Sequence, residues 1–173
     1  RDLNKLNDLN SAQKLKRLFK KRDPLNQRYQ ILMGKGLVAP VDYEKVLERI
    51  RNGIKNVRIA VKTEGEYSSE LEKLMITSLN DLDYRVERWK KEGGSFTHIV
   101  MGEIQMEKQH LKVKGFEKYR FILQISAING AGQKVGSLLF DTVTVGRDYK
   151  HAYSQARGLI KDFISKKMED LNI

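Results

Sequence analysis

The sequence predicts an α+β fold: a two-layer sandwich of a mostly antiparallel sheet covered by amphipathic helices, with an N-terminal helical arm. Two observations predict it. Residues 97–145 contain three long stretches in which apolar and polar side chains alternate, as in strands with one buried face. Residues 149–171 carry one apolar stripe at helical spacing. Since the apolar face of a sheet has to be covered, the two features are expected to form one buried interface.

Residues 1–41 are predicted to form a basic helical arm and connector, and residues 42–173 the α/β sandwich domain. The arm should be an amphipathic helix from Asp2 to Lys21 that ends at Pro24, because proline lacks an N–H and restricts the residue before it. Its apolar stripe consists of Leu3, Leu6, Leu9, Leu15, Leu18 and Phe19. Gly34, Gly36 and Pro40 indicate a connector.

The first part of the domain alternates helix and strand. Asp42 is a suitable N-cap for a helix that runs to about residue 54, and a strand is expected at 57–63. Ser69 and Glu72 have the spacing of a capping box, which would open a helix that reaches Leu82. A second strand is expected at 84–89.

A three-stranded meander and a final helix complete the predicted domain. The strands are expected at 97–114, 119–128 and 134–145. Asn129-Gly130 and Gly132 predict a hairpin turn between the last two, since Asn and Gly tolerate positive φ. The final helix should begin near Asp148 and cover the sheet.

The charge of the chain favours a polyanionic partner. It has 33 Lys and Arg against 22 Asp and Glu, a net charge of +11, and residues 1–36 alone hold ten basic and three acidic side chains. Nucleic acid and an anionic membrane surface both fit such a charge. The absence of cysteine excludes disulfides and thiolate catalysis, and no apolar run reaches the roughly 18–20 residues that span a bilayer.

Three groups of residues are candidates for contact with a polyanion or a protein partner. One is a cluster of six cations within nine residues; in the second an aromatic ring lies between cations; the third lies at the corner before the final helix. The competing interpretations are a solvated helix face, a partly buried strand residue and a simple cap by Asp148. The candidates are Lys14, Lys16, Arg17, Lys20, Lys21 and Arg22; Arg88, Trp89 and Lys90; and Arg147 and Tyr149.

Nothing in the sequence favours an enzyme. His98, His110 and His151 are far apart and form no metal-ligand pair, and neither a Gly-x-Ser-x-Gly elbow nor a phosphate-binding glycine loop occurs. The acidic pair Glu64 and Glu66 has the character of an exposed loop. We therefore expect no catalytic residues, no metal, no cofactor and no small-molecule substrate.

The order of elements after residue 57 resembles a domain of bacterial envelope lipoproteins. The resemblance rests on Val57–Val61, on Thr97–Ile104, and on the hairpin Phe121–Phe140 with Asn129-Gly130 at its turn. The families are the penicillin-binding-protein activator lipoproteins, the curli-secretion lipoprotein and the N-terminal domain of TolB. The resemblance covers about two thirds of the chain and carries no catalytic motif. The basic arm and a glycine-containing turn at 90–95 depart from the family pattern.

The resemblance implies a periplasmic or outer-membrane-associated protein, lipid-anchored upstream of Arg1, that binds another envelope protein. From its charge, we expect the basic arm to lie near an anionic membrane or partner. The alternative is a cytoplasmic RNA- or DNA-binding protein. Residues 121–145 and the small side chains Ala152 and Ala156 resemble the second half of a double-stranded-RNA-binding domain. That domain has a Lys-Lys pair at the start of its last helix, whereas this chain has Arg147, Lys150 and His151.

Overall fold

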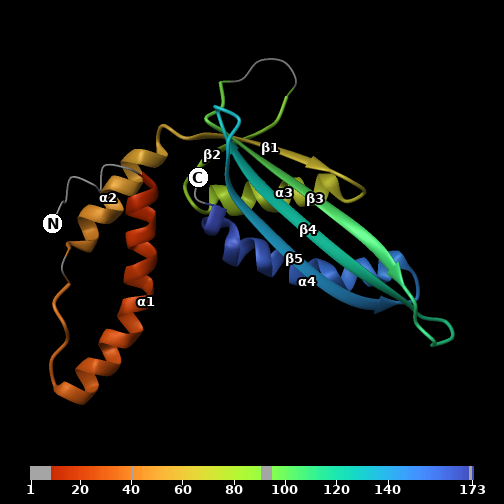
Figure 1. Ribbon diagram of the computed structural model, residues 1–173, viewed down its shortest axis with the longest axis horizontal. Helices are drawn as coiled ribbons and strands as arrows, with labels where there is room; N and C mark the ends of the chain where they lie inside the picture. The colour runs from red at the N-terminus through yellow and green to blue at the C-terminus, as the bar shows by residue number, and fades with distance from the viewer. Residues whose placement is uncertain (1–8, 40, 91–94, 172) are drawn as a thin grey trace. The chain divides into compact units, whose positions relative to one another are not determined.

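The chain forms two compact units, Arg1–Asn56 and Val57–Ile173. The structure is a computed structural model that describes residues 9–39, 41–90, 95–171 and 173. Figure 1 shows the elements in chain order along each unit. The first unit contains α1 (Leu9–Met33) and α2 (Tyr43–Ile54); the second contains β1 (Arg58–Glu64), α3 (Ser68–Asn80), β2 (Arg85–Arg88), β3 (His98–Gln109), β4 (Glu117–Asn129), β5 (Lys134–Gly146), α4 (Tyr149–Lys167) and the 3₁₀ turn η2 (Met168–Leu171).

In the first unit α2 packs along the first half of α1. The rings of Phe19 and Tyr43 lie 4.9 Å apart between centroids, and Ala12, Val46 and Ile50 are buried. Asp42 caps α2 as expected, because its side chain accepts a hydrogen bond from the Glu44 N–H at 3.0 Å. The chain therefore divides after Asn56, and α2 belongs with the arm, whereas the sequence analysis placed the division at residue 41.

The expected end of the arm helix at Pro24 was wrong, because α1 continues through Pro24 to Met33. Proline in a helix interior removes one hydrogen bond and costs about 3 kcal/mol in isolation. Contacts beyond Pro24 offset this cost: Arg22 donates to the Leu37 carbonyl, and the Leu37 N–H donates to the Asn26 side chain at 2.7 Å. The returning connector thus holds the second half of the helix.

Gly34 ends α1. Its φ is +72°, the left-handed conformation that glycine adopts without a Cβ clash, and its N–H donates to the Gln30 carbonyl at 2.9 Å. The glycine that indicated a connector in the sequence is therefore a helix cap, and the chain turns back immediately after Met33.

The second unit is built on a sheet whose described strands lie in the order β2-β1-β3-β4-β5. β1 pairs in parallel with both β2 and β3. For β1 and β2 the crossover is α3, which carries the chain back between them. The β3–β4 and β4–β5 pairs are antiparallel and much longer. This mixed sheet, mostly antiparallel by paired length, confirms the predicted fold class.

Both helices of this unit cover the same face of the sheet (Figure 1). Alternate residues of β4 are buried on that face, as the alternation predicted, and α3 and α4 supply the matching apolar side chains. The core includes Ile59, Val61, Leu71, Met75, Leu79, Val100, Tyr119, Phe121, Leu123, Ile125, Ala127, Ile160 and Ile164.

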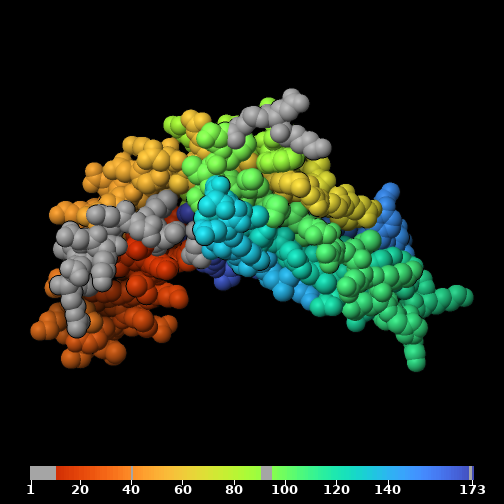
Figure 2. Space-filling model, turned by 45° about the horizontal axis from the view of Figure 1, so that its top comes forward, coloured from red at the N-terminus to blue at the C-terminus, as the bar shows by residue number. Residues whose placement is uncertain are grey.

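The turns that join the meander strands are of two kinds. The Asn129 turn is confirmed: the Asn129 N–H donates to the Gln133 carbonyl at 2.9 Å, and Gly132 has a φ of +77°. β3, in contrast, ends at Gln109, five residues before the expected end, and residues 110–116 form a turn that projects beyond the sheet in Figures 1 and 2.

Two further expectations concern helix starts. Asp148 caps α4, since its side chain accepts a hydrogen bond from the His151 N–H at 2.8 Å. The capping box of Ser69 and Glu72 does not form: α3 begins at Ser68 without a side-chain cap, and Glu72 pairs instead with Arg88 at 2.6 Å. Because the helix begins at Ser68, Ser69 lies inside its first turn and not at the N-cap position that a capping box requires.

Candidate functional site

Within the described part of the Val57–Ile173 unit, one face of the sheet carries no helix. Register places the side chains of this open face in rows that run from β1 across β3 and β4 to β5. One row contains Glu64, Glu103, Gln124 and Leu139. Its residues change from charged at β1 to apolar at β5, so the two sides of the open face differ in chemistry.

The strand β5 lies at one edge of the sheet and is 13 residues long. Within the described residues it pairs with β4 alone, so its outer side has no strand partner. Its open-face side chains Leu139, Val143 and Val145 are 65%, 45% and 38% exposed. An edge of this kind can pair with another extended chain.

The opposite edge of the sheet is protected. β2 has only four residues, and its side chains Arg85, Glu87 and Arg88 are exposed. Short length and charge are the usual ways in which proteins prevent pairing at an edge. β5 is long and carries few charges: it contains no proline, and its charged side chains are Lys134, at its first position, and Asp141.

The charge of Asp141 is neutralised by a neighbour. Arg120 on β4 donates through Nε to both carboxylate oxygens of Asp141, at 3.1 and 3.0 Å. The Arg120 guanidinium lowers the pKa of the Asp141 carboxyl by hydrogen bonding and by its charge. Arg120 also lies 3.5 Å from Glu107 on β3. The exposed surface along β5 is therefore apolar with a paired charge at its centre.

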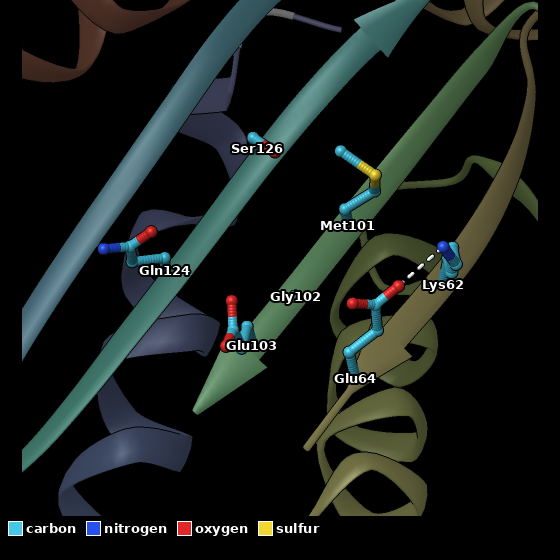
Figure 3. Close-up of a pocket in the computed structure, with 7 residues that line it drawn as sticks. All are labelled: Lys62, Glu64, Met101, Gly102, Glu103, Gln124 and Ser126. Atoms are coloured by element: carbon cyan, nitrogen blue, oxygen red, sulfur yellow. Dashed lines mark ion pairs between the residues drawn. The ribbon is translucent and has the colours of Figure 1, made fainter. Parts of the chain in front are cut away.

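A shallow groove of about 250 Å³ lies on the open face between β1, β3 and β4 (Figure 3). Lys62 and Glu64 form an ion pair of 2.6 Å across its side, and this hydrogen bond lowers the pKa of Glu64. Glu103 accepts a hydrogen bond from Gln105 at 3.1 Å. The lining residues are Lys62, Glu64, Met101, Gly102, Glu103, Gln124 and Ser126. None of these lining residues is a histidine.

The aromatic candidate Trp89 lies beside this groove. Its backbone N–H donates to the Val61 carbonyl at 2.9 Å, and the Lys62 ammonium lies 5.3 Å from the centre of its ring. Arg88 points to the other face, where it pairs with Glu72. Lys90 is exposed. The three neighbours in sequence therefore do not form one surface, because successive side chains of an extended chain alternate between faces.

The corner candidates lie where α4 begins. Arg147 is exposed, and its backbone N–H donates to the His151 ring at 3.3 Å. Tyr149 is half-buried, with the Lys150 ammonium 5.9 Å from its ring centre. This corner is occupied by local capping contacts.

A stacked pair of tyrosines, which sequence reasoning missed, joins α4 to the start of α3. The rings of Tyr67 and Tyr153 lie 3.4 Å apart and 8° from parallel. Tyr153 donates to Glu70 at 3.2 Å, and Arg157 pairs with the same carboxylate. The Tyr67 hydroxyl is buried without a hydrogen-bond partner among the described residues. No spacing pattern in the sequence marks this pair.

The tyrosine pair predicts a loss of stability at alkaline pH. Burial, with the charge of Glu66 and Glu70 adding to it, raises the pKa of Tyr67 from 10.0 to about 12, and burial and Glu70 raise that of Tyr153. A group whose pKa is raised by folding stabilises the fold below its unfolded value and loses this contribution as pH rises. The free energy of unfolding should therefore fall between about pH 10 and pH 12.

Denaturant titrations of the full chain at several pH values within this range measure the fall. The matched variant is Tyr67→Phe, which removes the titrating hydroxyl and keeps the stacked ring. It should lose less stability over the same range, and at neutral pH it should be as stable as the parent or more so, because the hydroxyl has no partner there. An equal alkaline loss in both proteins would contradict the assignment to Tyr67.

The six cations of the basic cluster all lie on α1. Lys14, Lys20 and Lys21 are exposed, and Lys16, Arg17 and Arg22 are half-exposed. Leu18, which the sequence analysis assigned to the apolar stripe, is not buried but 61% exposed, because α2 covers the neighbouring face that contains Phe19. The cluster therefore surrounds an exposed leucine.

The histidines do not come together. His98 begins β3, where burial lowers its pKa; His110 is exposed just after β3; and His151 lies in the first turn of α4. Among the described residues there is no group of three metal-binding side chains. Over the same part of the chain, none of the helices has the length and apolar character that crossing a membrane requires.

Similarity to known proteins is found among solved structures. Neither the family models nor the curated proteins contain a match to this chain. A minor lipoprotein from Acinetobacter baumannii is similar at 12% identity and a TM-score of 0.41, over 66% of this chain and 87% of that one. Lipoprotein GNA1162 from Neisseria meningitidis is similar at 6% identity and a TM-score of 0.42, over 62% and 97%.

A third similar structure is protein XCC0632 from Xanthomonas campestris, at 10% identity and a TM-score of 0.45, over 64% of this chain and 80% of that one. At these identities and scores the function has to be argued from the residues of this chain. Those residues single out the open face and the β5 edge of the second unit, and the cations of α1 in the first.

Proposed function

We propose that the Val57–Ile173 unit is a non-catalytic protein-interaction domain of the bacterial cell envelope, and that it binds an extended segment of another envelope protein along β5. The observation that carries the proposal is the contrast between the two sheet edges. β2 is short and charged, whereas β5 offers 13 residues with one unpaired side and three exposed apolar side chains.

Strand addition explains how such an edge binds. The backbone groups of the incoming segment supply hydrogen bonds, and its alternate side chains supply specificity. A segment paired with β5 places every second side chain on the open face, beside Leu139, Val143 and Val145. We therefore expect a partner segment with small or apolar residues at alternate positions and an acceptor or donor opposite the Asp141–Arg120 pair.

The envelope setting rests on the resemblance of the element order to envelope lipoproteins. A cysteine that follows an apolar leader in the full-length reading frame would support a lipid-anchored protein in the periplasm or at the outer membrane. An initiator methionine directly before Arg1 would count against it. Fractionation of cells that carry the gene tests the same point, with the protein expected in the membrane or periplasmic fraction.

Site-specific photocrosslinking tests the β5 edge. A benzoylphenylalanine is placed at Leu139 or Val143 and, as a matched control, at Leu159, which is 48% exposed on α4. In the native cells the two β5 positions should give the same discrete adduct with an envelope protein, and position 159 should not. With the crosslinker at Val145, the double substitution Leu139→Lys and Val143→Lys should abolish the adduct, since charge protects an edge.

Equal adducts at all three positions, or none at β5, would remove the edge as the binding site.

A cytoplasmic RNA- or DNA-binding protein is the second candidate function, favoured by the exposure of Lys14, Lys20 and Lys21 on one helix. Anisotropy titrations with labelled duplex RNA at two salt concentrations test it, because phosphate contacts weaken steeply as salt rises. Flat titration curves would eliminate that candidate.

A further inference from the structure

Cations and leucines alternate along one exposed line of α1. The positions are separated by four and three residues in turn, so they lie on one face of the helix. All six side chains are exposed, and the leucines are 61%, 65% and 82% exposed in chain order. This cation–leucine stripe consists of Lys14, Leu18, Lys21, Leu25, Arg28 and Leu32.

Within the first unit, α2 does not cover the stripe. Phe19, which is buried, packs against Tyr43 of α2, and the buried Ala12 lies seven residues earlier on the same face of α1. Leu18 belongs to a different face, because it precedes Phe19 by one residue and successive residues of a helix are about 100° apart. Single exposed leucines are common, but a row of three exposed leucines at heptad spacing is an apolar patch of the kind that marks a binding surface. The row therefore indicates an external apolar partner.

The stripe continues into an apolar tip where α1 ends and the chain turns back. Ile31 and Val38 are 83% and 93% exposed, and Met33 and Leu37 are exposed as well. The turn at Gly34 brings the end of the helix and the connector together. Lys35 lies within this tip and is also exposed. Residues 14–38 carry eight cationic side chains and one anionic side chain.

We propose that the first unit binds the surface of an anionic phospholipid bilayer. Leu18, Leu25 and Leu32, with the apolar tip, enter the boundary between headgroups and acyl chains. The cations between them contact the lipid phosphates. Helices that bind at this depth combine an apolar face with Lys and Arg, and their binding depends on both. The inference does not depend on strand addition at β5, which concerns the other unit.

Charge and apolarity together favour this occupant over the alternatives. Pairing with a second copy through the leucines would bring Lys14, Lys21 and Arg28 of both helices together at one contact face, and the stripe contains no anion to offset this repulsion. Nucleic acid would satisfy the cations but leaves the leucines and the apolar tip in water. An anionic bilayer satisfies both sets of side chains at one surface.

Vesicle sedimentation of the full chain separates the two contributions. The vesicles are an equal mixture of phosphatidylglycerol and phosphatidylcholine, with pure phosphatidylcholine for comparison. We expect binding to the anionic vesicles only. Replacing Leu18, Leu25 and Leu32 together by Gln keeps the charge and the helix propensity and should weaken binding at least about tenfold. Replacing Lys14, Lys21 and Arg28 by Gln should weaken it about a hundredfold.

The control substitution is Leu159→Gln on α4, which is 48% exposed and should leave vesicle binding unchanged. Helix content measured by circular dichroism shows whether each variant folds, and the exposed positions should tolerate the change. Because the chain contains no cysteine, the single substitutions Leu25→Cys and Leu32→Cys each create a unique site for the polarity-sensitive dye NBD.

NBD emission at positions 25 and 32 should shift to the blue on anionic vesicles, because both positions enter an apolar layer. Dye at Gln155→Cys, an exposed position of α4, should not shift. The inference is overturned if anionic vesicles are not bound, or if the leucine variants bind as well as the parent. It is equally overturned if the dye stays unshifted on bound protein, since this leaves a purely electrostatic contact of the kind that duplex RNA would also make.

Discussion

Phe121→Ala should lower the free energy of unfolding by about 3–5 kcal/mol, the range for truncation of a buried phenylalanine. The ring is 1% exposed at the centre of β4. It lies 5.9 Å from the Tyr153 ring on α4 and 6.5 Å from the Tyr119 ring on its own strand. Because these neighbours are held by stacking and hydrogen bonds, they cannot collapse into the space, and a cavity remains.

Denaturant titration of the full chain, monitored by circular dichroism, measures this change for the transition of the second unit. The matched control is Val143→Ala, which truncates a half-exposed residue on the open face of the neighbouring strand. It should change stability by no more than about 0.5 kcal/mol. If the two variants were equally destabilised, the helices would not be packed on the face that contains Phe121.

The meander and its cover could be predicted from the sequence because their signals are local. The alternation at Tyr119 to Ala127 states which face of β4 is buried, and Asn129-Gly130 states where it turns. The start of α4 follows from the capping side chain of Asp148. In each case neighbouring residues alone determine the conformation, so no knowledge of distant contacts was needed.

The arm differed because distant contacts decide its structure. Pro24 predicts a helix end from local sterics, yet the hydrogen bonds from Arg22 and to Asn26, made with a connector residue, keep the helix intact. Leu18 has the spacing of a buried residue, and its exposure depends on which face α2 covers. Helical spacing shows that a stripe exists, but not whether protein or another phase covers it.

For the binding candidates too, the features set by local sequence could be predicted, and the features set by distant contacts could not. The sequence predicts six cations on or just after one helix, and all six lie on α1 because α1 continues beyond Pro24. The sequence grouped Arg88, Trp89 and Lys90 as one candidate surface. In the structure they do not form one surface, because successive side chains of an extended chain point to opposite faces. The β5 edge depends on strand order, which alternation cannot reveal. One signal was nevertheless present: residues 135–145 contain no lysine and no proline.

Gly136→Ala should also destabilise the second unit strongly, by about 3 kcal/mol, because the new methyl group meets backbone. A Cβ at Gly136 would lie 1.9 Å from the Leu171 carbonyl oxygen and 2.9 Å from the Leu171 Cα. Leu171 and Ile173 are buried, and the Ile173 carbonyl accepts a hydrogen bond from the Tyr84 hydroxyl at 2.9 Å. The C-terminal turn therefore has to move away from β5 as a unit.

The same chemical change at Gly158 should have the opposite sign. Gly158 lies within α4, is exposed, and a Cβ there would meet nothing within 4 Å. Alanine in a helix interior is more stable than glycine by about 0.5–1 kcal/mol, so Gly158→Ala should raise the free energy of unfolding by that amount. Denaturant titrations of both variants beside the parent measure the pair. If Gly136→Ala were neutral, the turn after α4 would not be packed on β5; a stabilised Gly158→Ala beside it shows that the titration detects changes of this size.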